Sequence, residues 1–175
     1  MKATAEPFRT TGISARRVPS AGGEPDKVDW SGVEEMPVTY YACGTDKAQP
    51  YGCTMRLGHD GAYLYLELTE RIAPSRLENA GRISPCATWE FLFATERAQP
   101  YRYYLSGPDA RMAGSSCGEV NWRQNVPAKE SGDPAYWAKC RTDRTAADHW
   151  TSRWAFPLDR MTEKPVQPGE TVYMN

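Results

Sequence analysis

The chain has 175 residues, a length that fits one domain with its own hydrophobic core. Its 21 basic and 22 acidic residues leave a formal charge of −1 without any block of like charge, which excludes non-specific binding to nucleic acid or to an anionic membrane surface. Its apolar runs are far shorter than the roughly 20 residues that a membrane-spanning helix needs.

Short strands separated by glycine and proline turns are predicted along most of the chain. Residues 1–12 lack periodicity and are expected to form an extended arm, followed by a single domain at 13–175. In that domain the predicted strands, in chain order, are 13–18, 38–43, 62–69, 89–94, 101–105, 136–142, 150–156 and 171–174. Helical character is confined to residues 74–80 and one turn at 158–161.

Two predicted strands alternate so strictly that each side chain can be assigned to a face. In the first, one face holds the leucines and the other face is polar or aromatic: Leu64, Leu66 and Leu68 against Tyr63, Tyr65, Glu67 and Thr69. In the second, the more apolar face comprises Trp150, Ser152, Trp154 and Phe156, and the other Thr151, Arg153 and Ala155. The pattern predicts an all-β fold, an antiparallel β-sandwich of the jelly-roll or immunoglobulin-like type with little helix.

Residues that could support catalysis are few. Of the two histidines, His59 adjoins a predicted turn and His149 adjoins a core tryptophan, and a turn or surface role is favoured for each over that of a base or metal ligand. The chain has no nucleophile-elbow, zinc-protease, phosphate-loop or calcium-loop motif. We therefore expect no enzymatic activity and no cofactor, with calcium left open.

The five cysteines lack the C-x-x-C spacing of a zinc or redox site. Cys43 with Cys53, and Cys117 with Cys140, could bridge neighbouring strands. The alternative, that each is a buried small apolar residue, fits the sequence equally well.

The six tryptophans and ten tyrosines are the most informative feature of the composition. A sugar ring stacks its apolar C–H face on an aromatic ring, while its hydroxyl groups need planar polar partners. Trp122 lies among polar residues in a predicted loop, and Trp137 shares the polar face of its strand with Lys139 and Arg141. Both are predicted to be exposed enough to stack on a sugar.

Five segments, in this order, resemble the family 9 carbohydrate-binding module and its DOMON-like relatives. They are GGEPDKVDW at 22–30, HDGAYLYL at 59–66, WEFL at 89–92, WTSRWAFPL at 150–158 and GETVYMN at 169–175. The resemblance implies a β-sandwich that binds sugars without changing them chemically, often beside a polysaccharide-degrading enzyme. It also implies a sugar-contacting glutamate at Glu90 and polar positions of the next strand at Arg102 and Tyr104.

The chain departs from this family at its most characteristic positions. Ser84 stands where the first stacking tryptophan of the family lies, and the second would lie beyond Asn175. Ala87 replaces an aspartate, and Arg153 replaces a second glutamate. An ion pair between Arg153 and Glu90 is expected if their strands are neighbours.

Together these features predict a non-catalytic carbohydrate-binding module of a secreted polysaccharide-processing system, located outside the cytoplasm and binding neither nucleic acid nor membrane. Its expected contact set is Trp122, Trp137, Glu90, Arg102 and Tyr104. One alternative is a structural or docking domain of a larger secreted protein. The other is a DOMON-type haem domain, with axial ligands from Met55, Met112, His59, His149 or a lysine.

Overall fold

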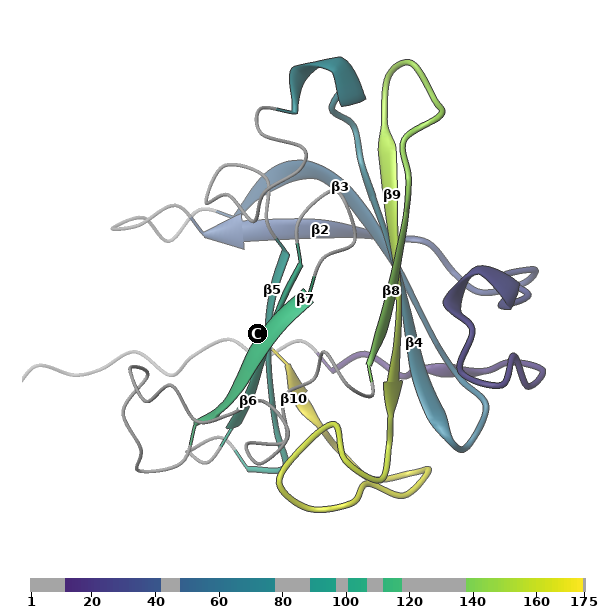
Figure 1. Cartoon of the computed structure of the whole chain (residues 1–175), viewed down its shortest axis with the longest axis vertical. Helices are drawn as coiled ribbons and strands as arrows, with labels where there is room; N and C mark the ends of the chain where they lie inside the picture. The colour runs from purple at the N-terminus through teal and green to yellow at the C-terminus, as the bar shows by residue number, and fades with distance from the viewer. Residues whose placement is uncertain are drawn as a thin grey trace, which may run out of the picture.

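The computed structural model describes residues 12–41, 48–77, 89–96, 101–106, 112–117 and 138–174. Two β-sheets face each other in this structure (Figure 1). The larger sheet has the strand order β1-β3-β4-β9-β8, with β2 also paired to β3. Its strands are β1 (Arg16–Arg17), β2 (Met36–Tyr41), β3 (Ala48–His59), β4 (Tyr63–Glu70), β8 (Lys139–Asp143) and β9 (Trp150–Pro157).

The smaller sheet has the strand order β10-β5-β6-β7. Its strands are β5 (Trp89–Ala94), β6 (Tyr101–Ser106), β7 (Met112–Cys117) and β10 (Tyr173–Met174). The helical elements among the described residues are two short 3-10 turns, η1 (Pro25–Lys27) and η2 (Pro74–Arg76). The predicted all-β sandwich is therefore confirmed, and none of the described helices is long and apolar enough to cross a membrane.

Two features of the larger sheet differ from the prediction. The short β1 pairs with β3 in parallel, whereas the other pairings described are antiparallel. No strand was predicted over the long β3, which contains Pro50 and Gly52. The pairing of β2 with β3 shifts register between Val38 and Thr39, which face Cys53 and Pro50. Gly52 adopts the left-handed conformation (φ +76°) at this bulge, a conformation that a glycine takes without strain.

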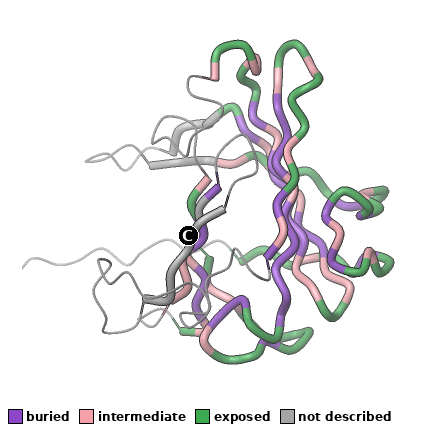
Figure 2. Tube along the Cα trace, in the orientation of Figure 1, coloured by how far each residue is buried: buried purple, intermediate pink, exposed green. Residues whose placement is uncertain are grey.

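Aromatic rings join the two sheets across the core. Phe91 of β5 meets Trp154 of β9 edge-on, with ring centroids 4.9 Å apart, and Phe93 meets Phe156 at the same centroid distance. The leucines of β4 belong to this cluster, as their alternation predicts. Figure 2 shows buried residues concentrated along the strands of the larger sheet.

The outer face of the larger sheet is covered by the segment that precedes β2. Val18, Val28 and Val33 of this segment form a second apolar cluster with Tyr65 and Ala155 of the sheet. Tyr65, which the alternation placed on the polar or aromatic face of its strand, is consequently fully buried. The alternation within β4 alone could not show this, because it does not indicate which other segment packs on that face.

Asp60 ties the covering segment to the sheet. Its Oδ1 accepts hydrogen bonds from the backbone N–H groups of Ala62 (2.9 Å) and Tyr63 (2.8 Å) in the β3–β4 turn. Its Oδ2 accepts hydrogen bonds from the hydroxyl groups of Tyr65 (2.7 Å) and Ser20 (3.1 Å). One carboxylate therefore shapes the turn and fixes the segment above it.

An Asp60→Asn protein is expected to be less stable at pH 7 by about 1–2 kcal/mol and less sensitive to acid. Burial would raise the pKa of Asp60, but the four hydrogen bonds together hold it below its ordinary value. Because the folded-state pKa is the lower one, this stabilisation is present at neutral pH and is lost as the pH falls through the folded pKa. Urea unfolding between pH 7 and pH 2.5 measures both effects. Asp148→Asn, at an exposed position, is the control, and an equal loss in both variants would contradict the expectation.

Cys53 and Cys140 are buried thiols. Burial, with a smaller contribution from the charge of Glu70, raises the pKa of Cys53 to about 12. The thiol of Cys140 lies 3.3 Å from the Ser106 hydroxyl group. For these two residues the structure therefore supports the buried-residue interpretation rather than the strand-bridging one; Cys43 and Cys86 lie outside the described residues.

Candidate functional site

The loop from Pro157 to Gln167 is firmly anchored at one end of the sandwich. The Leu158 N–H donates to the carbonyl of Ala62 (2.9 Å), and the Val166 N–H donates to the carbonyl of Leu158 (2.8 Å). From the smaller sheet, the Tyr104 hydroxyl group donates to the carbonyl of Met161 (2.8 Å). The loop is thus fixed by the turn after β3, by its own base and by β6, as a preformed binding site requires.

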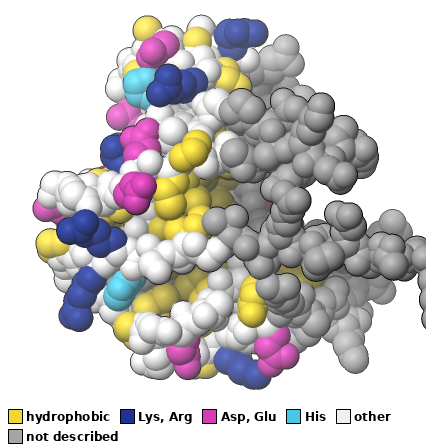
Figure 3. All heavy atoms as spheres, turned by 180° about the vertical axis from the view of Figure 1, so that it is seen from behind, with side chains coloured by type: hydrophobic (Ala, Val, Ile, Leu, Met, Phe, Trp, Pro, Cys, Tyr) yellow, Lys and Arg dark blue, Asp and Glu magenta, His cyan; other side chains and the backbone are white. Residues whose placement is uncertain are grey.

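Two pockets adjoin this loop and share Leu158, Val166 and Gln167 in their walls. The first, here called the apolar pocket, has a volume of about 900 Å³ and lies between the end of the larger sheet and the chain around β10. Figure 3 shows hydrophobic side chains in a hollow of this side of the molecule. Its apolar lining includes Leu57, Leu64, Phe93, Met161, Val172 and Met174.

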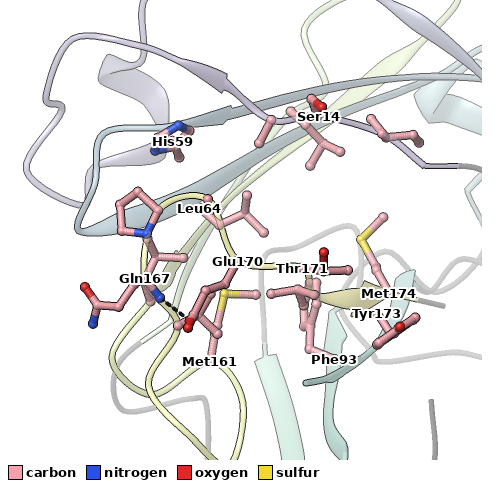
Figure 4. A pocket seen from close by; sticks show the side chains of 18 of the residues that line it. Ser14, His59, Leu64, Phe93, Met161, Gln167, Glu170, Thr171, Tyr173 and Met174 are labelled. Atoms are coloured by element: carbon pink, nitrogen blue, oxygen red, sulfur yellow. Dashed lines mark hydrogen bonds between the residues drawn. The ribbon is translucent and has the colours of Figure 1, made fainter. Parts of the chain in front are cut away.

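Polar groups lie among the apolar lining of this pocket. His59 projects from the end of β3, across the pocket from Tyr173 and Met174 (Figure 4). Its Nδ1 atom is buried and has no hydrogen-bond partner among the described residues. Elsewhere in the lining, the backbone N–H of Gln167 donates a hydrogen bond to the Glu170 carboxylate (2.7 Å), which closes a tight turn.

The second pocket, here called the polar pocket, has a volume of about 550 Å³. Tyr63 lines it, with its ring stacked on that of Tyr65 at a centroid distance of 6.0 Å. The chain comes close to the hydroxyl-bearing tip of the ring: a Cβ atom on Gly23 would lie 2.6 Å from Cζ of Tyr63, so this position requires a glycine. The tyrosine is half-buried and held in place.

An ion pair provides the charged groups of the polar pocket. The Arg160 guanidinium donates to both carboxylate oxygens of Asp159, at 3.1 Å and 2.9 Å. This hydrogen bonding holds the pKa of Asp159 below its ordinary value. Both side chains are exposed, so the pair presents a planar donor and acceptor array to solvent beside Tyr63.

The residues predicted from the sequence do not converge on one site. In β5 and β6, Glu90 faces Leu105, whereas Tyr104 faces the buried Phe91. Because side chains alternate along a strand, Glu90 is on the outer face of the smaller sheet, and Arg102 and Tyr104 are on its inner face. These three residues cannot therefore contact one sugar together.

Tyr104 belongs to the core rather than to a binding surface. It is 0% exposed, and its ring packs edge-on against Phe93 and Phe156. Arg102 of β6 donates a hydrogen bond to the carbonyl of Arg160 and so helps to anchor the loop from Pro157 to Gln167 on the smaller sheet. The expectation of a sugar contact at Tyr104 is thereby corrected, while Glu90 is exposed and Trp122 and Trp137 lie outside the described residues.

The condition for an ion pair between Arg153 and Glu90 is not met, because their strands, β9 and β5, are in different sheets. Arg153 is on β9 in the larger sheet and donates through Nε to Glu67 of β4 (2.7 Å). Arg56 of β3 donates to the other carboxylate oxygen of Glu67 (2.9 Å). Glu67 was assigned to the outer face of β4, and the cross-strand register of three neighbouring strands brings its two partners to it.

Three of the candidate haem ligands lie apart in the structure. No group of three or more histidine, cysteine, aspartate or glutamate side chains comes together in the described part of the chain. His59 and His149 lie at opposite ends of the β4–β9 pair, and Met55 is in the core. These three candidate axial ligands are therefore not arranged around one pocket.

The residues of the polar pocket were not among the site residues predicted from the sequence. Tyr63 was assigned to the outer face of its strand, and Asp159 and Arg160 to a turn after Pro157. An adjacent opposite-charge pair two residues after a strand-ending proline is a usable signal, but only the register of β4 with β9 places it beside Tyr63.

Comparisons with known proteins establish the fold. No protein-family model matches the chain, and no curated protein matches it. A solved structure from Bacteroides uniformis, provisionally named a carbohydrate-binding protein, is similar with a TM-score of 0.63 over 93% of this chain and 80% of that one. The likeness is one of fold. At 15% sequence identity it supports the β-sandwich and does not establish membership of the family 9 module.

Proposed function

We propose that the chain binds carbohydrate without changing it chemically, and that the sugar occupies the polar pocket. The strongest support is that the half-buried Tyr63 and the Asp159–Arg160 ion pair line the same pocket. A pyranose presents an apolar C–H face, which an aromatic ring accepts, and hydroxyl groups, which a carboxylate and a guanidinium bind. Gln167 adds an amide in the same wall.

The chemistry of this pocket favours binding over hydrolysis. Glycosidases of the common type need two carboxyl groups facing each other across the scissile bond, one of them protonated. The polar pocket has one carboxylate in its lining, Asp159, and Arg160 keeps that carboxylate ionised. We infer a recognition site rather than an active site.

The setting that we propose follows from the fold and from the aromatic composition. The similar structure from Bacteroides uniformis supports a carbohydrate partner for this chain as well. We place the protein outside the cytoplasm, as an accessory domain next to a polysaccharide-processing enzyme. Trp122 and Trp137 remain candidates for further contacts with a longer glycan.

A glycan-array screen followed by calorimetric titration tests this function. Tyr63→Ala should weaken binding at least about tenfold, while Tyr63→Phe, which keeps the ring, should retain most of it. Arg160→Ala should weaken binding by a similar factor because it removes the donors and leaves Asp159 unpaired.

Arg144→Ala is the matched control for Arg160→Ala. Arg144 is also exposed, but it lies before β9, at the end of that strand opposite to the polar pocket. Thermal unfolding verifies that each variant is folded. A folded Arg160→Ala protein with unchanged affinity for every bound glycan, or a wild-type protein that binds no glycan, would refute the proposal.

A further inference from the structure

We propose that the ligand is an amphiphilic glycoside whose apolar aglycone occupies the apolar pocket while its sugar lies in the polar pocket. The inference rests on the proposed function for the sugar part. It adds a second binding site and the chemical class that this site accepts.

The lining of the apolar pocket suits an alkyl or aryl group better than a sugar. Most of its side chains are aliphatic or methionine, and Phe93, one of its aromatic residues, is fully buried. Aliphatic walls give a pyranose no flat surface for stacking, but they make close contacts with hydrocarbon. Methionines such as Met161 and Met174 adapt to apolar groups of different shape.

Exposed apolar side chains gather at the same place. The large hydrophobic residues that are exposed in the described part of the chain are Ile13, Ile72 and Met174. Two of them, Ile13 (42% exposed) and Met174 (37% exposed), line the apolar pocket. An apolar rim around an apolar hollow marks a surface that gains free energy when a ligand covers it.

The two pockets are placed for one ligand. They share Leu158, Val166 and Gln167, so the wall between them is formed by the two ends of the anchored loop, which are hydrogen-bonded to each other. The volumes, about 900 Å³ and about 550 Å³, both lie in the usual range for small-molecule sites. A glycosidic bond at Gln167 would direct the sugar toward Tyr63 and the aglycone toward Leu64 and Val172.

Methyl, butyl and hexyl β-glycosides of glucose, galactose, mannose and xylose test the inference by calorimetry below their micellar concentrations. Each buried methylene should raise affinity about fourfold. For the sugar that binds, we expect the hexyl glycoside to bind at least tenfold more tightly than the methyl glycoside. Phenyl glycosides of the same sugar distinguish an aryl from an alkyl preference, and hexan-1-ol measures the chain without a sugar.

Two variants test whether the gain in affinity with chain length comes from the apolar pocket. Ala15→Phe should fill the pocket and remove the dependence on chain length, while the affinity for the methyl glycoside stays unchanged. Val172→Asp, which puts a charge into the lining, should do the same if Ala15→Phe does not fold.

The results separate this inference from the proposed function. Equal affinities of methyl and hexyl glycosides would overturn the inference and leave the proposed function standing. Failure of every hexyl glycoside to bind would also overturn it, and the glycan screen would then decide the function alone. Binding of hexan-1-ol as tight as that of every hexyl glycoside would overturn both, because it would show an apolar site without sugar recognition.

Discussion

Replacing Trp154 with alanine is expected to lower the free energy of unfolding by about 3–5 kcal/mol, the range for large-to-small aromatic substitutions in a core. Trp154 is 0% exposed, stacks on Phe156 with ring centroids 5.4 Å apart, and meets Phe91 from the facing sheet. Its Nε1 donates to the Ser152 hydroxyl group (2.7 Å), so alanine leaves a cavity and removes a buried hydrogen bond. For a chain of this length the melting temperature should fall by about 6–20 °C.

Chemical and thermal unfolding measure this loss directly. Ile72→Ala is the control, because Ile72 is exposed and its truncation should cost less than about 0.5 kcal/mol. A loss of 1 kcal/mol or less for Trp154→Ala would contradict the packing of the two sheets through this ring.

Glu67→Ala is the second substitution with a large expected effect. Glu67 is 6% exposed and forms ion pairs with two arginines, Arg56 and Arg153. Without this carboxylate, the two positive charges face each other across the space that its side chain occupied. Removing one partner of a fully buried pair costs about 3–5 kcal/mol. Because the arginine side chains are about a third exposed, we expect about 2–3 kcal/mol here.

Glu35→Ala is the matched control for Glu67→Ala. Glu35 also binds Arg56 (2.8 Å), but its side chain is 43% exposed, and surface pairs contribute about 1 kcal/mol or less. Urea unfolding of both variants gives the comparison. Similar losses for the two would show that Glu67 is not the buried centre of the charge network.

The sequence predicted those parts of the fold in which periodicity alone determines burial. The leucines of β4 and the apolar face of β9 lie in the core as their alternation indicates. Tyr65 and Glu67 are buried, although the alternation placed them on the polar or aromatic face of β4. The segment before β2 covers Tyr65, and arginines on two neighbouring strands pair with Glu67. Neither the cover nor the strand order is encoded in a local pattern.

The site was harder to predict than the fold for a related reason. The resemblance to a known family grouped Glu90, Arg102 and Tyr104 as sugar contacts. The pleat of β5 and β6 instead puts Glu90 on the outer face of the smaller sheet and the other two residues on its inner face. The polar pocket instead combines Tyr63 with Asp159 and Arg160, which are almost a hundred residues away in the chain. Only the pairing of β4 with β9 brings such residues to one end of the sandwich.

A nuclear magnetic resonance titration of the isotope-labelled protein with the strongest binder from the glycan screen tests directly whether the sugar occupies the polar pocket. The proposed function predicts the largest shifts of amide signals within residues 61–63 and 157–167, which line the polar pocket or form its loop. Shifts confined to the indole signals of Trp122 and Trp137, with the signals of the polar pocket unchanged, would place the sugar elsewhere and contradict it.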